Sequence, residues 1–247
     1  MIVVTGPIIK KQLEEKVIKK LNSLKSLFVI FFIGLPLLAF LPFKLNLFRS
    51  GPILNENIMA AIARVNTGSG SGSAFLISSN KLITARHVVE DFNEGELVTL
   101  DFEKASTKLT DVEAKIIYLP ENENKDFAIL ELTHPINNIP YLQLVSSDAI
   151  SINDKINIVG YPATLFSSTI GTISNNLIPE NTDLLQLNAG AWPGSSGGPV
   201  LIDATDQVVG ILVLGLEGQY KGMVFALKSD VILKDPEIIK RGISLSN

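Results

Sequence analysis

Apolar residues fall in many short runs between Ile58 and the C-terminus, and each run is bounded by residues that favour turns. Short runs rich in Val, Ile, Leu, Phe and Thr, separated by Gly, Pro, Asn and Asp, are typical of β-strands. The predicted strands cover residues 60–66, 72–78, 81–84, 96–102, 111–119 and 126–132, followed by 155–161, 168–174, 184–189, 199–203, 207–215 and 222–227. Two sets of six short strands with almost no long helix predict an all-β fold of two six-stranded antiparallel barrels, with a C-terminal helix from Ser229.

A different pattern precedes these strands. Residues 8–25 place apolar side chains at helical spacing between lysines, which predicts a short basic amphipathic helix. Residues 27–43, LFVIFFIGLPLLAFLPF, contain no charged residue. As a helix this run would rise about 25 Å, close to the lower limit for crossing a hydrocarbon core of about 30 Å, with a kink expected at Pro36.

Three interpretations compete for this apolar run: an uncleaved signal anchor, a cleaved signal peptide and a buried core helix. The long segment before it and the lack of a small-x-small cleavage pattern after it favour the anchor, and a core helix would show a polar face. Most of the lysines near the run precede it, so the positive-inside rule places the N-terminus in the cytoplasm. The predicted organisation is a basic cytoplasmic helix at 1–26, a transmembrane signal anchor at 27–43, a linker at 44–57 and a globular domain at 58–247.

Charge is unevenly distributed along the chain. The 247 residues carry a net charge of −4, but the part after residue 54 holds 13 Lys and Arg against 23 Asp and Glu, a balance of −10. An acidic body lacks the basic surface that phosphate backbones attract, so nucleic-acid binding is not expected. There is no cysteine, which excludes disulfides, a cysteine nucleophile and thiolate metal sites. An exported domain without disulfides suits a bacterial envelope protein better than an animal secreted protein.

The segment GAWPGSSGGPV, residues 190–200, is the first candidate for chemistry, because glycines and a proline flank two serines and predict a tight, exposed turn. Taken alone, such a segment could equally be a plain loop. A nucleophilic serine needs a base and an acid that orients the base. His87 follows directly on a predicted strand, whereas His134 precedes a proline in a loop and is interpreted as structural.

Asp126 is the preferred orienting acid. An apolar run of strand character follows it, which would hold its carboxylate at the edge of a buried sheet. Asp101, Asp111, Asp148 and Asp154 fall at strand edges or in loops and are interpreted as solvent charges.

Four segments occur in a characteristic order: GSGSAFLI at 70–77, TARHVV at 84–89, DFAIL at 126–130 and PGSSGGPV at 193–200. Together they resemble the chymotrypsin-like (trypsin-like) serine proteases. Within that family the chain is similar to bacterial envelope proteases of the high-temperature-requirement type, over roughly residues 58–232. Each motif alone is weak or moderate, but four in order are jointly specific.

The resemblance implies that Ser196 is the nucleophile, that His87 is the general base and then acid, and that Asp126 fixes the tautomer of the histidine. The backbone N–H groups of Gly194 and Ser196 would form the oxyanion hole, and a glycine at 194 would leave room for the scissile carbonyl. Ser195 stands where digestive members carry an aspartate that pairs with a newly cut N-terminus. Activation by N-terminal cleavage is therefore not expected, and the loop would be ordered by its own contacts or by a ligand.

The substrate pocket of the family corresponds to uncharged positions in this chain: Gly190, Ala191, Val213, Leu214 and Gly215. This predicts a preference for small or medium apolar residues before the cut and disfavours basic or acidic ones. Trp192 and Pro193 depart from the usual residues, and Trp192 is interpreted as a packing aromatic beside the pocket.

The predicted function is a membrane-anchored serine endopeptidase of bacterial origin, with its catalytic domain on the periplasmic or extracellular side and with neither metal nor cofactor. The expected partners are a protein or peptide substrate and the membrane; no oligomeric state is predicted. Only about 20 residues follow the barrels, so the PDZ domain of many envelope proteases is not expected. One alternative is a catalytically silent protease-like domain that binds or scaffolds. An esterase on another fold is disfavoured because the helices of an α/β-hydrolase are missing from the pattern.

Overall fold

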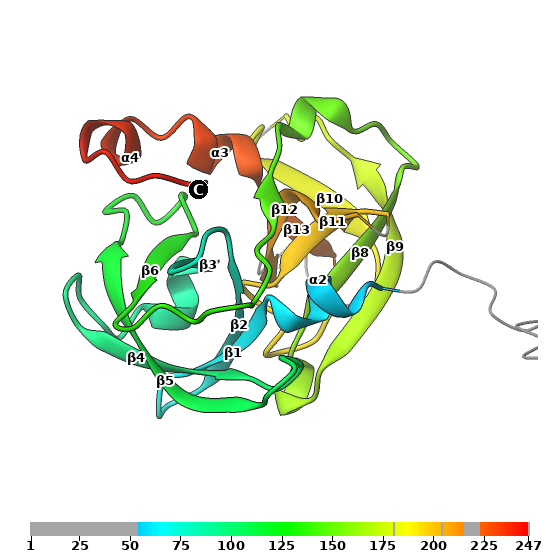
Figure 1. Ribbon diagram of the computed structural model, residues 1–247. Helices are drawn as coiled ribbons and strands as arrows, with labels where there is room; N and C mark the ends of the chain where they lie inside the picture. The colour runs from blue at the N-terminus through cyan, green and yellow to red at the C-terminus, as the bar shows by residue number, and fades with distance from the viewer. Residues whose placement is uncertain (1–53, 180, 204, 215–222, 247) are drawn as a thin grey trace, which may run out of the picture. The chain divides into compact units, whose positions relative to one another are not determined.

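The computed structural model describes residues 54–246, apart from residues 180, 204 and 215–222. The elements are α2 (Glu56–Ala60), β1 (Ile62–Asn66), β2 (Ser71–Leu76), β3 (Lys81–Thr84), η1 (Arg86–Val89), β4 (Leu97–Phe102), β5 (Leu109–Tyr118), β6 (Ala128–Leu132), β7 (Gln143–Leu144), η2 (Ser147–Ala149), β8 (Lys155–Gly160), η3 (Pro162–Thr164), β9 (Ser167–Asn175), β10 (Leu184–Asn188), β11 (Pro199–Ile202), β12 (Gln207–Leu214), β13 (Val224–Lys228), α3 (Ser229–Leu233) and α4 (Pro236–Lys240), where η marks a short 3₁₀ helix. Figure 1 shows them in chain order.

The predicted basic helix at 1–26, the predicted anchor at 27–43 and most of the predicted linker lie outside the described residues. In the part of the chain that the structure describes, no helix is long and apolar enough to cross a membrane.

The first six strands close into an antiparallel barrel, in the order β1, β2, β3, β6, β5 and β4, drawn in cyan and green in Figure 1. The pairing of β3 with β6 ends with Thr84 opposite Ala128. Side chains alternate between the two faces of a strand, so the apolar members of each strand fill the interior of the barrel. The predicted set of six strands is therefore present here, with ends shifted by one or two residues.

Six strands of the second half, β8 to β13, form the second barrel, in which the pairing of β11 with β12 closes the ring. The predicted fold of two six-stranded barrels is thus confirmed. One strand was not predicted: β7 joins the edge of β12 in parallel, with Gln143 opposite Gln207 and Leu144 opposite Val208. Two residues are too few to leave a periodic pattern in the sequence.

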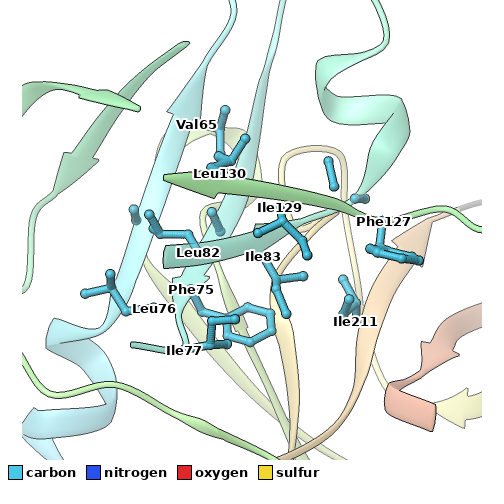
Figure 2. Packing of buried hydrophobic residues seen from close by; sticks show 14 of the residues in the cluster. Val65, Phe75, Leu76, Ile77, Leu82, Ile83, Phe127, Ile129, Leu130 and Ile211 are labelled. Atoms are coloured by element: carbon cyan, nitrogen blue, oxygen red, sulfur yellow. The ribbon is translucent and has the colours of Figure 1, made fainter. Parts of the chain in front are cut away.

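One hydrophobic cluster extends from the first barrel into the second. Figure 2 shows Ile211 of β12 in the same cluster as Ile83 of β3 and Phe127, which directly precedes β6. Phe127 is 0% exposed. Burying a phenylalanine side chain contributes about 1.5–3 kcal/mol, so this contact fixes the chain immediately after Asp126.

Two details of the prediction differ in the structure, although the predicted C-terminal helix does begin at Ser229. Helix α2 occupies part of the predicted linker, so β1 begins at Ile62 rather than at 60. The predicted C-terminal helix is two short helices, because Asp235 caps α4 and Pro236 at its first position lacks the N–H that would continue α3. In Figure 1, α3 (orange-red) lies beside the second barrel and α4 (red) lies on the side of the first barrel.

Candidate active site

His87 and Asp126 emerge side by side at one end of the first barrel. Strands β3 and β6 are antiparallel neighbours, so the segment that follows β3 and the segment that precedes β6 leave the sheet together. Asp126 Oδ1 accepts a hydrogen bond from the His87 backbone N–H at 3.0 Å. Asp126 Oδ2 lies 2.7 Å from Nδ1 of the His87 ring. The carboxylate therefore holds both the main chain and the ring of the histidine.

The surroundings of His87 favour its protonated form. Burial by itself lowers the pKa of His87, but the hydrogen bond and the charge of Asp126, with a smaller contribution from Glu90, raise the pKa above its ordinary value of 6.5. A carboxylate that stabilises the imidazolium is the arrangement in which a histidine can take a proton from a hydroxyl as charge develops.

The serine loop, residues 192–198 between β10 and β11, consists of two successive turns. The Ser195 N–H donates to the Trp192 carbonyl at 2.9 Å, and the Gly198 N–H donates to the Ser195 carbonyl at 3.0 Å. Ser196 occupies the second position of the second turn and is 6% exposed. The loop is thus a compact structure closed by its own main chain.

Both turns contain a glycine that the local structure requires. Gly194 has φ +95° and Gly197 has φ +84°, in the region that favours glycine. A Cβ on Gly194 would lie 2.5 Å from the Tyr161 carbonyl oxygen. A Cβ on Gly197 would lie 2.1 Å from the Ser73 carbonyl oxygen and 2.5 Å from Thr84 Oγ1. Glycine at 194 is therefore needed for contact with the segment after β8, a reason that the sequence did not reveal.

Two backbone N–H groups of the serine loop are held away from internal acceptors. Among the residues that the structure describes, the N–H groups of Gly194 and Ser196 have no hydrogen-bond partner. The carbonyl of each of these peptide groups is held on the other side: Pro193 accepts from the Ala163 N–H at 3.0 Å, and Ser195 accepts within the second turn. Because the C=O and N–H of a trans peptide point in opposite directions, these bonds fix the direction of both N–H groups.

The serine loop is tied to both barrels, but Ser196 and His87 are not hydrogen-bonded to each other. The Ser196 carbonyl accepts from the Ser73 N–H of β2 at 2.8 Å, and the Gly197 N–H donates to the Leu212 carbonyl of β12 at 2.8 Å. In the described part of the chain no hydrogen bond joins the His87 ring to the Ser196 hydroxyl. In enzymes, a hydrogen bond between a base and a hydroxyl nucleophile is often long before substrate binds and shortens in the complex.

The predicted substrate pocket is described in part. Gly190 is exposed, Ala191 is half-buried, Val213 is buried, Leu214 ends β12, and Gly215 lies outside the described residues. The Trp192 ring lies over Gly190, where a Cβ would be 2.7 Å from the nearest ring atom. Trp192 is 56% exposed, so the side chain interpreted as a packing aromatic also presents an open face beside this position.

Asp101 corrects one interpretation made from the sequence. Its position in the sequence predicts a solvent charge, but Asp101 is 4% exposed. Arg64 lies opposite it in the register of β1 with β4 and forms an ion pair with it at 2.5 Å. Asn66 Nδ2 and the Asp111 N–H also donate to its carboxylate, each at 3.0 Å. A pairing across two strands depends on their register, which the sequence pattern alone does not give.

The remaining candidates lie where the sequence analysis expected them. Asp111, Asp148 and Asp154 are exposed. His134 is also exposed, and its Nδ1 lies 3.2 Å from Thr133 Oγ1. Over the described residues no three His, Cys, Asp or Glu side chains form a group that could hold a metal ion.

A polar cluster that the sequence analysis did not identify adjoins Asp126. The Asp235 side chain is fully buried, pairs with Lys125 Nζ at 2.7 Å and accepts from the Tyr118 hydroxyl at 3.0 Å. Burial would raise the pKa of Asp235, but hydrogen bonds from Lys125, from the Ile238 N–H and from Tyr118 lower it below 3.8. Since Lys125 directly precedes Asp126, this cluster connects α4 to the segment that carries the acid. The position of Lys125 directly before Asp126 was the only feature of the sequence that pointed to this cluster.

Curated relatives are serine endoproteases. The chain is 29% identical over 185 residues to a protein of Chlamydia pneumoniae named "probable periplasmic serine endoprotease DegP-like", covering 68% of this chain and 36% of that protein. It is 25% identical over 171 residues to a glutamyl endopeptidase of Staphylococcus epidermidis, covering 65% of this chain and 60% of that protein. The chain thus spans little more than a third of the length of the chlamydial relative.

Solved structures show the same fold. The HtrA-type protease AlgW, solved with a tripeptide, superposes with a TM-score of 0.61 at 25% identity, covering 77% of this chain and 65% of AlgW. The inactive form of Rv3671c from M. tuberculosis H37Rv gives a TM-score of 0.59 at 22% identity, covering 77% of this chain and 94% of that chain. The sequence profile of the trypsin-like peptidase domain matches residues 72–211, which is more than half of the chain. The two β-barrels, the His–Asp pair and the glycine-bounded serine loop agree with this match. The chain belongs to the trypsin-like peptidase domain family.

Proposed function

We propose that this chain is a serine endopeptidase whose catalytic triad is Ser196, His87 and Asp126. The observation that carries the proposal is the combination of the His87–Asp126 pair, joined at 2.7 Å, with a serine loop whose Gly194 and Ser196 N–H groups lack an acceptor among the described residues. A base held by an acid and two oriented donors beside a serine are the parts that acyl transfer requires.

In the proposed reaction the Ser196 hydroxyl oxygen attacks the scissile carbonyl carbon, and its proton moves to Nε2 of His87. The Gly194 and Ser196 N–H groups stabilise the oxygen anion of the tetrahedral intermediate. His87 then gives the proton to the leaving amine as the C–N bond breaks, which leaves an acyl-enzyme. Water, deprotonated by the same histidine, hydrolyses the ester and restores Ser196, while Asp126 stays ionised throughout.

The proposed location is the periplasmic or extracellular side of a bacterial membrane, with the N-terminus in the cytoplasm. The uncharged run at 27–43 and the lysines that precede it support this placement. The chlamydial relative carries the word periplasmic in its name. Proteinase added to sealed, right-side-out spheroplasts should digest the barrels but not a tag placed at the N-terminus, and a protected barrel domain would contradict this topology.

The proposed substrate is an extended peptide or unfolded protein with a small or medium apolar residue before the cut. AlgW has been solved with a tripeptide and with a decapeptide, which supports a peptide ligand on this fold. The described pocket positions carry no charge, and the open face of Trp192 adds apolar surface. A peptide-library profile dominated by Arg, Lys or Glu before the cut would overturn this specificity.

The test of the function uses the full chain in detergent, a fluorophosphonate probe and an unfolded protein substrate. We expect the wild type to be labelled at Ser196 and not at Ser195, as located by mass spectrometry of the labelled peptide, and to cleave the substrate. Ser196→Ala and His87→Ala should lower the turnover number by roughly 10⁶-fold. Folded wild type that neither labels nor cuts would refute the enzyme proposal, and labelling without cleavage would favour a protease-like binding domain.

A further inference from the structure

Ser73 in β2 is a buried side chain that the proposed reaction does not use. It belongs to the segment GSGSAFLI, which contributed to the family resemblance without any assigned role. Its residue is 0% exposed. The hydroxyl donates to the Gly194 carbonyl at 2.8 Å and accepts from the Tyr161 N–H at 2.9 Å. Because the Gly194 carbonyl can only accept and the Tyr161 N–H can only donate, the single proton of the hydroxyl is committed to Gly194.

The main chain of Ser73 contacts the same loop. Its N–H donates to the Ser196 carbonyl at 2.8 Å. One residue of the first barrel therefore holds both residues that carry the proposed oxyanion donors, although 121 positions separate Ser73 from Gly194. With the partners described above for Trp192, Pro193 and Ser195, every carbonyl from 192 to 196 is hydrogen-bonded.

The space around Ser73 is closed. A Cβ on Gly160 would lie 2.6 Å from the Ser73 hydroxyl oxygen, and a Cβ on Gly197 would lie 2.1 Å from its carbonyl oxygen. The end of β8 and the serine loop thus both approach the serine closely, and each has a glycine at the contact. Without the hydroxyl, the Gly194 carbonyl and the Tyr161 N–H would both lose their partner in a buried place, which is unfavourable.

We propose that Ser73 is a positioning residue for the oxyanion hole. From the first barrel, its hydroxyl fixes the Gly194 carbonyl, and this keeps the serine loop in the conformation that presents the two N–H groups. The inference rests on the proposed function. It explains how this loop is ordered although Ser195 cannot form the ion pair that orders it in digestive relatives. The serine loop is instead held by a buried contact within the chain, which does not depend on an activator.

The test compares Ser73→Ala with Ser78→Ala in the full chain. Ser78 is an equally buried serine of the first barrel, 2% exposed, whose hydroxyl contacts Asn80 and the Lys81 N–H and does not touch the serine loop. For Ser73→Ala we expect the rate constant of fluorophosphonate labelling to fall roughly 10- to 100-fold, below the 10²–10³-fold loss that follows removal of a whole oxyanion donor. The concentration of probe for half-maximal rate should stay the same, and so should the pH midpoint, because the His87–Asp126 pair is intact. Ser78→Ala should label at the wild-type rate.

Amide hydrogen exchange gives a readout that does not need activity. In Ser73→Ala the amides of Ala163 and Ser195, which bond to carbonyls of the serine loop, should exchange at least tenfold faster than in Ser78→Ala. Equal exchange in the two variants would overturn the positioning role, whatever the activity. A wild type that fails to label, together with faster exchange in Ser73→Ala, would refute the proposed function and leave standing only the structural role of Ser73 in holding the serine loop.

Discussion

The two barrels hold their parts of the site in different ways. In the first barrel, His87 and Asp126 are fixed by a side chain: one carboxylate binds both the ring and the main chain of the histidine. In the second barrel, the serine loop is fixed mainly through its own main-chain carbonyls, one of which accepts from the Ser73 hydroxyl, and by glycines with positive φ. Activity should therefore be most sensitive to the chemical nature of the side chains in the first part of the site. In the second part, it should be most sensitive to the space left for the serine loop.

Asp126→Asn changes the chemistry of the first part and keeps its shape. The amide oxygen can still accept from the His87 N–H, but the amide nitrogen would face Nδ1 and favour the tautomer with its proton on Nε2, which cannot act as a base. We expect the turnover number to fall roughly 10⁴-fold with little change in thermal stability. Steady-state kinetics and a melting curve on the same preparation check this, and a loss below tenfold would show that Asp126 is not the orienting acid.

The pH dependence adds a second measure of the same contact. The base must be neutral, so kcat/KM should rise as pH passes the pKa of His87, which Asp126 holds above 6.5. In Asp126→Asn the carboxylate no longer opposes the effect of burial, so the midpoint should move below 6.5. Identical midpoints in the two proteins would contradict the assignment of His87 as the titrating group.

Gly197→Ala changes the space in the second part and keeps its chemistry. The new methyl group would lie 2.1 Å from the Ser73 carbonyl oxygen, so the serine loop must move. We expect at least a 100-fold loss of activity, since a displacement of about 1 Å at a reacting group can cost that much. Stability should fall by roughly 2–5 kcal/mol from crowding and backbone strain together, measured by urea unfolding.

Gly95→Ala is the matched control. Gly95 also has a positive φ, +95°, but the nearest atom to a Cβ there is a flexible lysine carbon at 3.9 Å. This variant should lose only the backbone part, about 1–2 kcal/mol, and should keep full activity. If both variants lose the same stability and Gly197→Ala stays active, the position of Ser196 does not depend on close packing of the serine loop.

Asp235→Asn, which should have the smallest effect of the three variants, tests whether the contacts of α4 help to hold the first part of the site. The amide can still cap α4, but the charged bond to Lys125 is lost, which should cost about 2 kcal/mol at pH 7 and lower Tm by roughly 4–8 °C. The pKa of Asp235 is lowered on folding, so its contribution to stability is present above pH 3.8 and disappears as pH falls below that value. The Tm difference between variant and wild type should therefore shrink in acid, as differential scanning calorimetry can measure.

Glu237→Gln is the control for this variant, because Glu237 is an acid of the same helix whose side chain is 43% exposed and pairs with Lys240 and Arg241 at the surface. It should leave Tm unchanged at both pH values. A fall in activity for Asp235→Asn with an unchanged pH midpoint would show that the cluster supports the position of Asp126 and not the charge of His87.

Local patterns predicted most of the fold. Twelve of the strands leave an apolar run between turn residues, so their positions could be read to within one or two residues. Strand β7 could not be predicted, since its two residues are held only by an edge of β12. The C-terminal helix begins at Ser229 as predicted, and the cap at Asp235 together with Pro236 at the first position of α4 explains why it is divided into two short helices.

The sequence by itself indicated which residues can supply the chemistry: a histidine after a strand, an acid before a buried strand and a serine among glycines, in the order that the family shows. The tertiary structure decided how they are held. The register of β3 with β6 brings His87 to Asp126, and the contacts of Ala163 and Ser73 direct the peptide groups of the serine loop. The physical reason is that the strand register and the contacts of the serine loop depend on main-chain groups of distant segments, even where the partner is a side chain such as the Ser73 hydroxyl. Every residue except proline carries the same main-chain donor and acceptor, so only the fold decides which ones meet.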